Sequence, residues 1–177
     1  NVSVVKRNGV TLVPPEVTTY NYTTVGSRES VALPNGTRTS YEYDTLNRLK
    51  KASNLDAASQ VLSSYDYTLA LNGRRTGIAE HRLEADATLS TTNIAYGYDD
   101  LNRLVSESSV SSVARLNFGK AYTYDLVGNR VSRTTTGDKA ETATYSYSYN
   151  DQLITETAVA QDGTNTTSYG YDDNGSL

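Results

Sequence analysis

The stretch Tyr41-Glu42-Tyr43-Asp44-Thr45-Leu46-Asn47-Arg48-Leu49 decides the fold, because it returns along the chain with the same internal spacing. Clear further copies occupy residues 96–104, 122–130 and 169–177, and weaker copies start at Tyr20, Tyr65 and Tyr147. The second tyrosines stand at 22, 43, 67, 98, 124, 149 and 171, so the period runs from 21 (22 to 43) to 31 (67 to 98). This spacing is typical of stacked supersecondary repeats.

Each copy predicts a strand followed by a tight turn. A period of two places both tyrosines of a pair on one face of a strand. The following aspartate can accept hydrogen bonds from amides two residues on, and the Asn or Gly that follows tolerates left-handed angles. The repeat positions are Tyr20, Tyr22, Tyr41, Tyr43, Asp44, Arg48, Tyr65, Tyr67, Tyr96, Tyr98, Asp99, Arg103, Tyr122, Tyr124, Asp125, Gly128, Arg130, Tyr147, Tyr149, Tyr169, Tyr171, Asp172 and Gly175.

Two copies depart from the pattern. Thr68 follows Tyr67 where aspartate is expected, which predicts a longer turn through Asn72-Gly73, and Asn150 stands for aspartate after Tyr149. Tyr145 is the only tyrosine outside the pairs. We expect the tyrosine of one repeat to lie beside that of the next across the sheet, where aromatic pairs contribute about 0.5–1.5 kcal/mol beyond area burial.

The pattern Tyr-x-Tyr-Asp-x-x-Gly/Asn-Arg/Asn-Leu/Arg resembles the tyrosine-aspartate (YD) repeat of the Rhs family, which is related to bacterial toxin-complex shells and to teneurins. The resemblance covers Tyr20 to Leu177. It implies a spiralling sheet of β-hairpins, and in the family such arrays form hollow cocoons around a C-terminal toxin. The family segment that closes the shell and releases the toxin has no counterpart in these residues.

The chain therefore predicts an all-β, antiparallel β-hairpin repeat array of about sixteen strands, roughly two per repeat. Residues 1–19 are expected to form an N-terminal hairpin around Asn8-Gly9 that completes or caps the array, and Pro14-Pro15 to break its ladder, because proline donates no backbone hydrogen bond. Residues 20–177 are expected to form the array, with the last repeat incomplete. Glu80 to Ala87 is the best helical candidate, but it has no useful apolar stripe.

Composition excludes several classes of protein. Leu, Ile, Val and Phe make up only about one fifth of the residues, so tyrosine must supply much of the buried surface. The net charge of −4, with both signs interspersed, gives no footprint for nucleic acid and no basic segment for a membrane. The chain has no Cys, which excludes disulfides, and no Met, which suggests an excerpt or a processed product.

Candidate sites have structural explanations. Asp99-Asp100 and Asp172-Asp173 resemble cation ligands, but further oxygen donors do not recur at calcium-loop spacing, so turn capping is expected. Arg48, Arg103 and Arg130 could bind an anion, although pinning the neighbouring turn explains them better. His81, the only histidine, is expected in a solvated loop. No catalytic, metal or cofactor site is predicted, and we expect no enzyme.

The expected function is a non-catalytic scaffold in a large secreted or cell-surface bacterial Rhs-type protein. It would form a shell wall or, by head-to-tail joining of copies, an extracellular fibre. The alternative is a glycan- or cell-surface-binding module that uses exposed tyrosine faces, which requires substantial exposure of Tyr43, Tyr98 and Tyr124. The expected partner is a neighbouring copy or repeat, with no nucleic acid and no membrane insertion.

Overall fold

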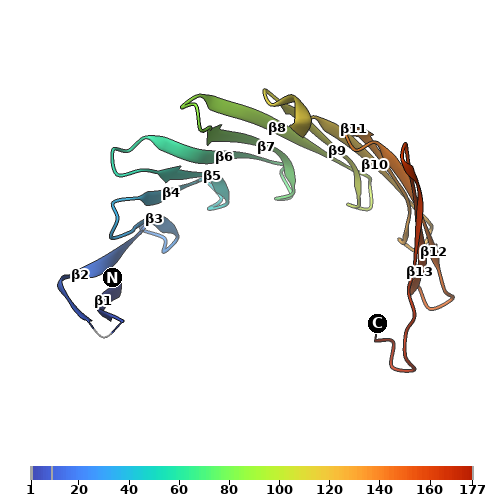
Figure 1. Cartoon of the computed structure of the whole chain (residues 1–177), viewed down its shortest axis with the longest axis horizontal. Coiled ribbons are helices and arrows are strands. Elements are labelled where there is room, and N and C mark those ends of the chain that lie inside the picture. The colour runs from blue at the N-terminus through green and yellow to red at the C-terminus, as the bar shows by residue number, and fades with distance from the viewer. Residues whose placement is uncertain (1, 9, 177) are drawn as a thin grey trace. The chain divides into compact units, whose positions relative to one another are not determined.

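The computed structural model describes residues 2–8 and 10–176. The strands form one open antiparallel sheet in which strand order follows chain order from β1 to β14 (Figure 1). The all-β repeat array expected from the sequence is therefore confirmed. Contacts divide the chain into two compact units, Asn1–Asn93 and Ile94–Leu177, and strand β8 (Leu89–Tyr98) spans the division.

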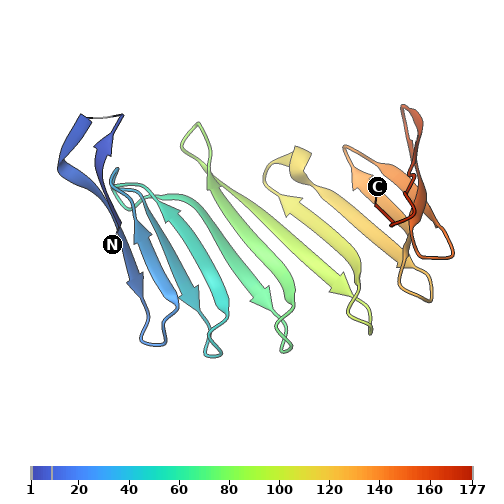
Figure 2. The same ribbon diagram turned by 90° about the horizontal axis from the view of Figure 1, so that it is seen from below.

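The first unit is a meander in which each strand pairs with the strand before it, side by side in blue to green in Figure 2. Its strands before β8 are β1 (Val2–Arg7), β2 (Val10–Tyr22), β3 (Arg28–Ala32), β4 (Arg38–Tyr43), β5 (Leu49–Leu55), β6 (Val61–Leu69) and β7 (Arg75–Leu83). The best helical candidate, residues 80–87, forms the end of β7 and a turn. It is not a helix, as the absence of an apolar stripe indicated.

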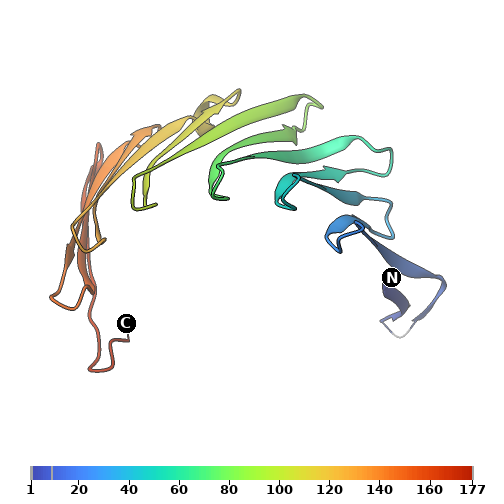
Figure 3. The ribbon, with the colours of Figure 1, turned by 180° about the vertical axis from the view of Figure 1, so that it is seen from behind.

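The second unit continues the same meander, in yellow to red in Figure 3. Its strands after β8 are β9 (Leu104–Ser111), β10 (Phe118–Tyr124), β11 (Arg130–Gly137), β12 (Glu141–Tyr147), β13 (Leu153–Ala160) and β14 (Gly163–Ser168). One turn of 3-10 helix, Ala114–Leu116, lies between β9 and β10.

The strand count differs from the expected sixteen, because the described residues form fourteen strands. Pro14-Pro15 does not end a strand: β2 runs from Val10 through Tyr22, and only the pairing with β1 is irregular, with Val4 opposite Glu16 and Lys6 opposite Thr11. Proline has a φ compatible with extended backbone, so it can interrupt the ladder while the strand itself continues. At the other end, Tyr169 and Tyr171 lie outside any strand. The division into a hairpin over 1–19 and an array over 20–177 stays a prediction.

Neither unit has a second layer of structure among its described residues. The most buried residues are Ser53, Ser64 and Thr92 in the first unit, and Ser109, Ala143 and Tyr145 in the second. All of them have small side chains except Tyr145, whose ring lies under Arg130. Ala143 is 0% exposed and Tyr145 is 8% exposed. The sheet therefore covers itself by laying its own long side chains across neighbouring strands.

The two faces of the second unit differ sharply. On the tyrosine face, Tyr122 lies opposite Arg133, and Arg133 lies opposite the buried Ala143. The other face, which we call the hydroxyl face, is mostly exposed. It consists of Gly119, Ala121, Thr123, Ser132, Thr134, Thr136, Thr142, Thr144, Ser146, Thr155, Thr157, Val159, Thr164, Thr166 and Ser168.

Candidate functional site

The aspartate of each clear copy organises a five-residue turn. In residues 44–48, the Asp44 amide donates to the Arg48 carbonyl (2.9 Å) and the Asn47 amide to the Asp44 carbonyl (2.9 Å). Asp44 Oδ1 accepts hydrogen bonds from the amides of Leu46 (3.0 Å) and Arg48 (2.9 Å). Asn47 has a φ of 59°, the left-handed angle that Asn tolerates better than most residues. Side chain and backbone thus define the same turn.

Residues 99–103 repeat this arrangement. Asp99 Oδ1 accepts from the amides of Leu101 (3.0 Å) and Arg103 (2.8 Å), and Asp99 Oδ2 lies 2.7 Å from Arg103 Nε. The Arg103 amide is the main cause that lowers the pKa of Asp99 below its ordinary value, helped by the Arg103 side chain; the Arg48 amide does the same for Asp44. These carboxylates stay ionised and occupied, which suits capping and not acid catalysis.

The same turn recurs in the other two clear copies and in the return turns between strands. Asp125 accepts hydrogen bonds from the amides of Val127, Gly128 and Asn129, and Gly128 has a φ of 105°. Asp172 accepts from the amides of Asn174 and Ser176 in the last copy. The return turns have the same backbone closure at residues 33–37, 56–60 and 84–88. Sequence reasoning missed this equivalence, although Asx residues at Asn35, Asp56 and Asp86 could have indicated it.

The last residue of a turn reaches the turn of the next repeat. Arg48 Nη1 donates to the Ala70 carbonyl (2.9 Å), and Arg103 Nη1 donates to the Asp125 carbonyl (3.2 Å). Asn129 takes the same position one repeat later, and its Nδ2 donates to Asp151 Oδ1 (2.8 Å). A guanidinium can therefore bond its own aspartate and the next turn at once. Such bonds link successive repeats at the ends of their strands, where these turns lie.

The second tyrosine of a pair fastens its strand to the strand before it. The phenol of Tyr124 on β10 donates to the Leu104 carbonyl at the start of β9 (2.7 Å). Tyr43 makes the same bond to the Arg28 carbonyl (2.8 Å), and Tyr147 to the Arg130 carbonyl (2.9 Å). These contacts explain why the motif uses tyrosine, since phenylalanine would supply the ring without the donor. We call this set of turn, link and phenol contacts the staple.

Arginine side chains cover the tyrosine rings. Arg103 lies 4.8 Å from the centroid of the Tyr124 ring. Arg130 lies 4.4 Å from the Tyr145 ring and 5.8 Å from the Tyr122 ring, so one guanidinium bridges two repeats. Such contacts contribute about 0.5–1 kcal/mol at exposed sites. Further pairs of this kind join Arg75 to Tyr67 and Arg28 to Tyr20.

The expectation that tyrosines of consecutive repeats lie directly beside each other is wrong. Tyr41 lies opposite Ala52, and Ala52 lies opposite Tyr65. Each repeat contributes two strands and only one of them carries the pair, so successive pairs are two strand spacings apart, about 9.5 Å. Arginine, alanine and glutamate fill the intervening positions, as Glu156 does opposite Tyr145.

The copy at Tyr147 was placed two residues out of phase. The pairing shows a bulge at the second tyrosine, where Tyr43 pairs with Leu49 and Tyr124 with Arg130; the same bulge pairs Tyr147 with Leu153. Tyr147 is therefore the second tyrosine and Tyr145 the first. Tyr149, assigned to the motif from the sequence, is fully exposed at 108%.

Ser148 consequently occupies the aspartate position of that copy. Its hydroxyl accepts hydrogen bonds from the amides of Asn150 and Gln152 (both 3.2 Å). The sequence signal was the separation from Tyr147 to Leu153, which equals the separation from Tyr43 to Leu49.

The copy at Tyr65 is also shifted by two residues. The bulge pairs Leu69 with Arg75, so Tyr67 is the first aromatic position and Leu69 replaces the second tyrosine. Ala70 then takes the aspartate position of the turn 70–74, which closes by the usual backbone hydrogen bonds. The turn expected to be longer after Tyr67 is therefore of the usual length and starts two residues later, at Ala70.

The remaining repeat residues are placed as follows. Tyr20 and Tyr22 lie on β2, and Tyr22 is 56% exposed; Tyr96 and Tyr98 lie on β8. The Tyr169 phenol lies within hydrogen-bond distance of Glu156 Oε2 (3.4 Å), and Gly175 has a φ of 77°. Tyr43, Tyr98 and Tyr124 are half-buried. Burial raises the pKa of Tyr122, Tyr145 and Tyr147, so these phenols remain protonated donors.

His81 is not in a solvated loop. It lies on β7, half-buried, with Nδ1 3.1 Å from Thr91 Oγ1 on β8. Within the described residues, no three His, Asp or Glu side chains are placed to hold a metal ion. No helix in the described part of the chain is both long and apolar enough to cross a membrane.

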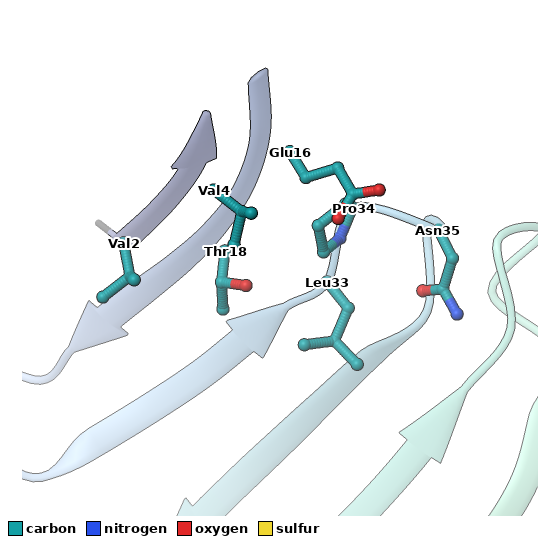
Figure 4. A pocket seen from close by; sticks show the side chains of 7 residues that line it. All are labelled: Val2, Val4, Glu16, Thr18, Leu33, Pro34 and Asn35. Atoms are coloured by element: carbon teal, nitrogen blue, oxygen red, sulfur yellow. The ribbon is translucent and has the colours of Figure 1, made fainter. Parts of the chain in front are cut away.

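An open groove of about 510 Å³ lies between the first hairpin and the turn after β3 (Figure 4). Val2, Val4 and Leu33 give it an aliphatic wall, with Glu16 and Asn35 at its margin. One carboxylate and one amide among aliphatic side chains make no acid–base pair. The groove offers apolar surface and no catalytic constellation.

Comparison with known proteins finds solved structures of similar fold but no matching family. Neither a protein-family model nor a curated protein matches the chain. The crystal structure of TcdB2-TccC3-Cdc42 aligns with 90% of this chain and 10% of its own chain, at 17% identity and a TM-score of 0.56. The Tc holotoxin pore of Photorhabdus luminescens aligns with 85% of this chain and 9% of that chain, at 17% identity and a TM-score of 0.53. The chain spans about a tenth of the length of these chains, and it shares the fold of that part of the Tc toxin structures.

Proposed function

We propose that the chain is a non-catalytic structural scaffold, a stretch of YD-repeat wall in a large secreted or cell-surface bacterial protein of the Rhs type. The observation that carries this proposal is the staple. It joins turns of successive repeats through Arg48, Arg103 and Asn129, and it joins neighbouring strands through Tyr43, Tyr124 and Tyr147. A sheet held together in this way can grow repeat by repeat without a second layer.

The likeness to Tc toxin structures supports the shell-wall form of the proposal, because those proteins contain a segment of the same fold. In the other form, open-ended units join edge to edge as an extracellular fibre. Both forms use the same wall, and both place the partner in a neighbouring repeat or copy.

The glycan-binding alternative receives less support. It requires open tyrosine faces, but Tyr43 and Tyr124 are half-buried and their phenols donate to backbone carbonyls. A ring held between arginine and backbone offers little face for a sugar.

Electron microscopy of the purified protein tests the proposal. Hollow closed particles with thin walls support the shell, and filaments of constant width support the fibre. Particles that are compact and solid, with no continuous wall, contradict both forms.

A further inference from the structure

The hydroxyl face of the second unit carries no charged side chain on any described residue of β10 to β14. The tyrosine face of the same strands carries Lys120, Arg133, Glu141 and Glu156. One fifth of the whole chain is charged (20%), so the segregation is a marked departure from an even distribution. Exposed sheets commonly use charges to oppose association, and this face has none.

The hydroxyl groups of this face are partly satisfied by one another. The side-chain oxygens of Thr123 and Ser132 lie 2.6 Å apart, and those of Ser146 and Thr155 are also 2.6 Å apart. Thr136 Oγ1 accepts from the Gly119 amide on the neighbouring strand (3.0 Å). A hydroxyl that already has a partner loses less free energy when water is removed than an unpaired one does.

The side chains of the face are small and in register. One row crosses five strands: Thr123, Ser132, Thr144, Thr157 and Thr166. No residue of this row is larger than threonine, so a second sheet could approach to the usual spacing of about 10 Å. Twisted sheets pack well at an angle of about −30°, so twist is no obstacle to such contact.

We propose that the hydroxyl face is an interface between two copies of this chain, packed sheet on sheet. A charged surface docked here would bury its charges with no counter-charge among the described residues of the face, which is costly. The partner must therefore also be uncharged where it touches, and the same face of a second copy meets this requirement without like-charge repulsion. The proposal goes beyond the wall function, because a wall or fibre grows through strand edges and this contact uses a face.

Sedimentation velocity between about 1 µM and 1 mM tests the proposal across the range of weak to moderate association. The chain is expected to form a dimer at the upper end of this range. Thr144→Lys, at the centre of the face on β12, is expected to raise the dissociation constant by about tenfold or more. The matched control is Thr167→Lys, an exposed β14 position on the tyrosine face opposite Glu156, which should leave the dimer intact.

A second measurement keeps the test independent of the folding of the lysine variant. The chain has no cysteine, so Thr144→Cys and Thr157→Cys each introduce a unique thiol. A short bis-maleimide should yield covalent dimers with either variant and none with Thr167→Cys. A monomer at every concentration overturns the proposal, as does a dimer that Thr144→Lys leaves unchanged while its far-UV circular dichroism shows a native sheet. The latter result would place association at the strand edges.

Discussion

Replacing Tyr124 with phenylalanine removes one oxygen atom and leaves the ring in place. The lost contact is the phenol donation to the Leu104 carbonyl at 2.7 Å, near the optimum for an O–H···O hydrogen bond. A neutral hydrogen bond contributes about 0.5–1.5 kcal/mol net, and the upper part of that range applies where the carbonyl left behind cannot reach water. Because Tyr124 is half-buried under Arg103, we expect a loss of about 1 kcal/mol.

Urea unfolding followed by far-UV circular dichroism measures this loss, and the melting temperature should fall by about 2–4 °C. Tyr149→Phe is the matched control, because its ring is fully exposed and the change should stay within about 0.5 kcal/mol. Combining Tyr43→Phe with Tyr124→Phe should give close to the sum of the two single losses, since these residues lie in different units and share no hydrogen-bond partner. Equal effects of Tyr124→Phe and Tyr149→Phe would refute the role assigned to the phenol.

Tyr145→Ala should destabilise the protein by about 2–4 kcal/mol and Tyr149→Ala by less than about 0.5 kcal/mol, as measured by chemical denaturation. A larger loss for Tyr149→Ala would mean that Tyr147 and Tyr149 form the pair of this copy. Gly137→Ala should lower the stability of the protein more than Gly128→Ala. Both residues have positive φ, but only at Gly137 would a new Cβ meet backbone, 2.4 Å from the Asn117 carbonyl oxygen. Similar melting temperatures of the two variants would contradict this. The lowered pKa of Asp44 and Asp99 makes their contribution to stability complete above the unfolded value of about 3.9, and it is lost as pH falls through the lower folded value. Melting temperature followed from pH 6 to about 2 should therefore drop less in the Asp44→Asn/Asp99→Asn variant than in the unmodified chain, and parallel curves would count against these two groups.

The alternation of tyrosine with small or polar residues was sufficient to predict strands, their antiparallel order and a sheet with one aromatic face. The Asp turns were equally local, because Asp44 and Asp99 bond amides within four residues of themselves. Both features depend on neighbours in the chain, which a sequence displays directly.

Pairing between strands decided the rest. A shift of two residues leaves every side chain on the same face, so the alternation at Tyr145, Tyr147 and Tyr149 could not reveal which two rings belong to the repeat. The bulge that pairs Tyr147 with Leu153 selected them, and the register placed Ala52, not a tyrosine, beside Tyr41. The segregation of charge in the second unit likewise became visible only once the strands were aligned, because a face is made of residues from strands far apart in the chain.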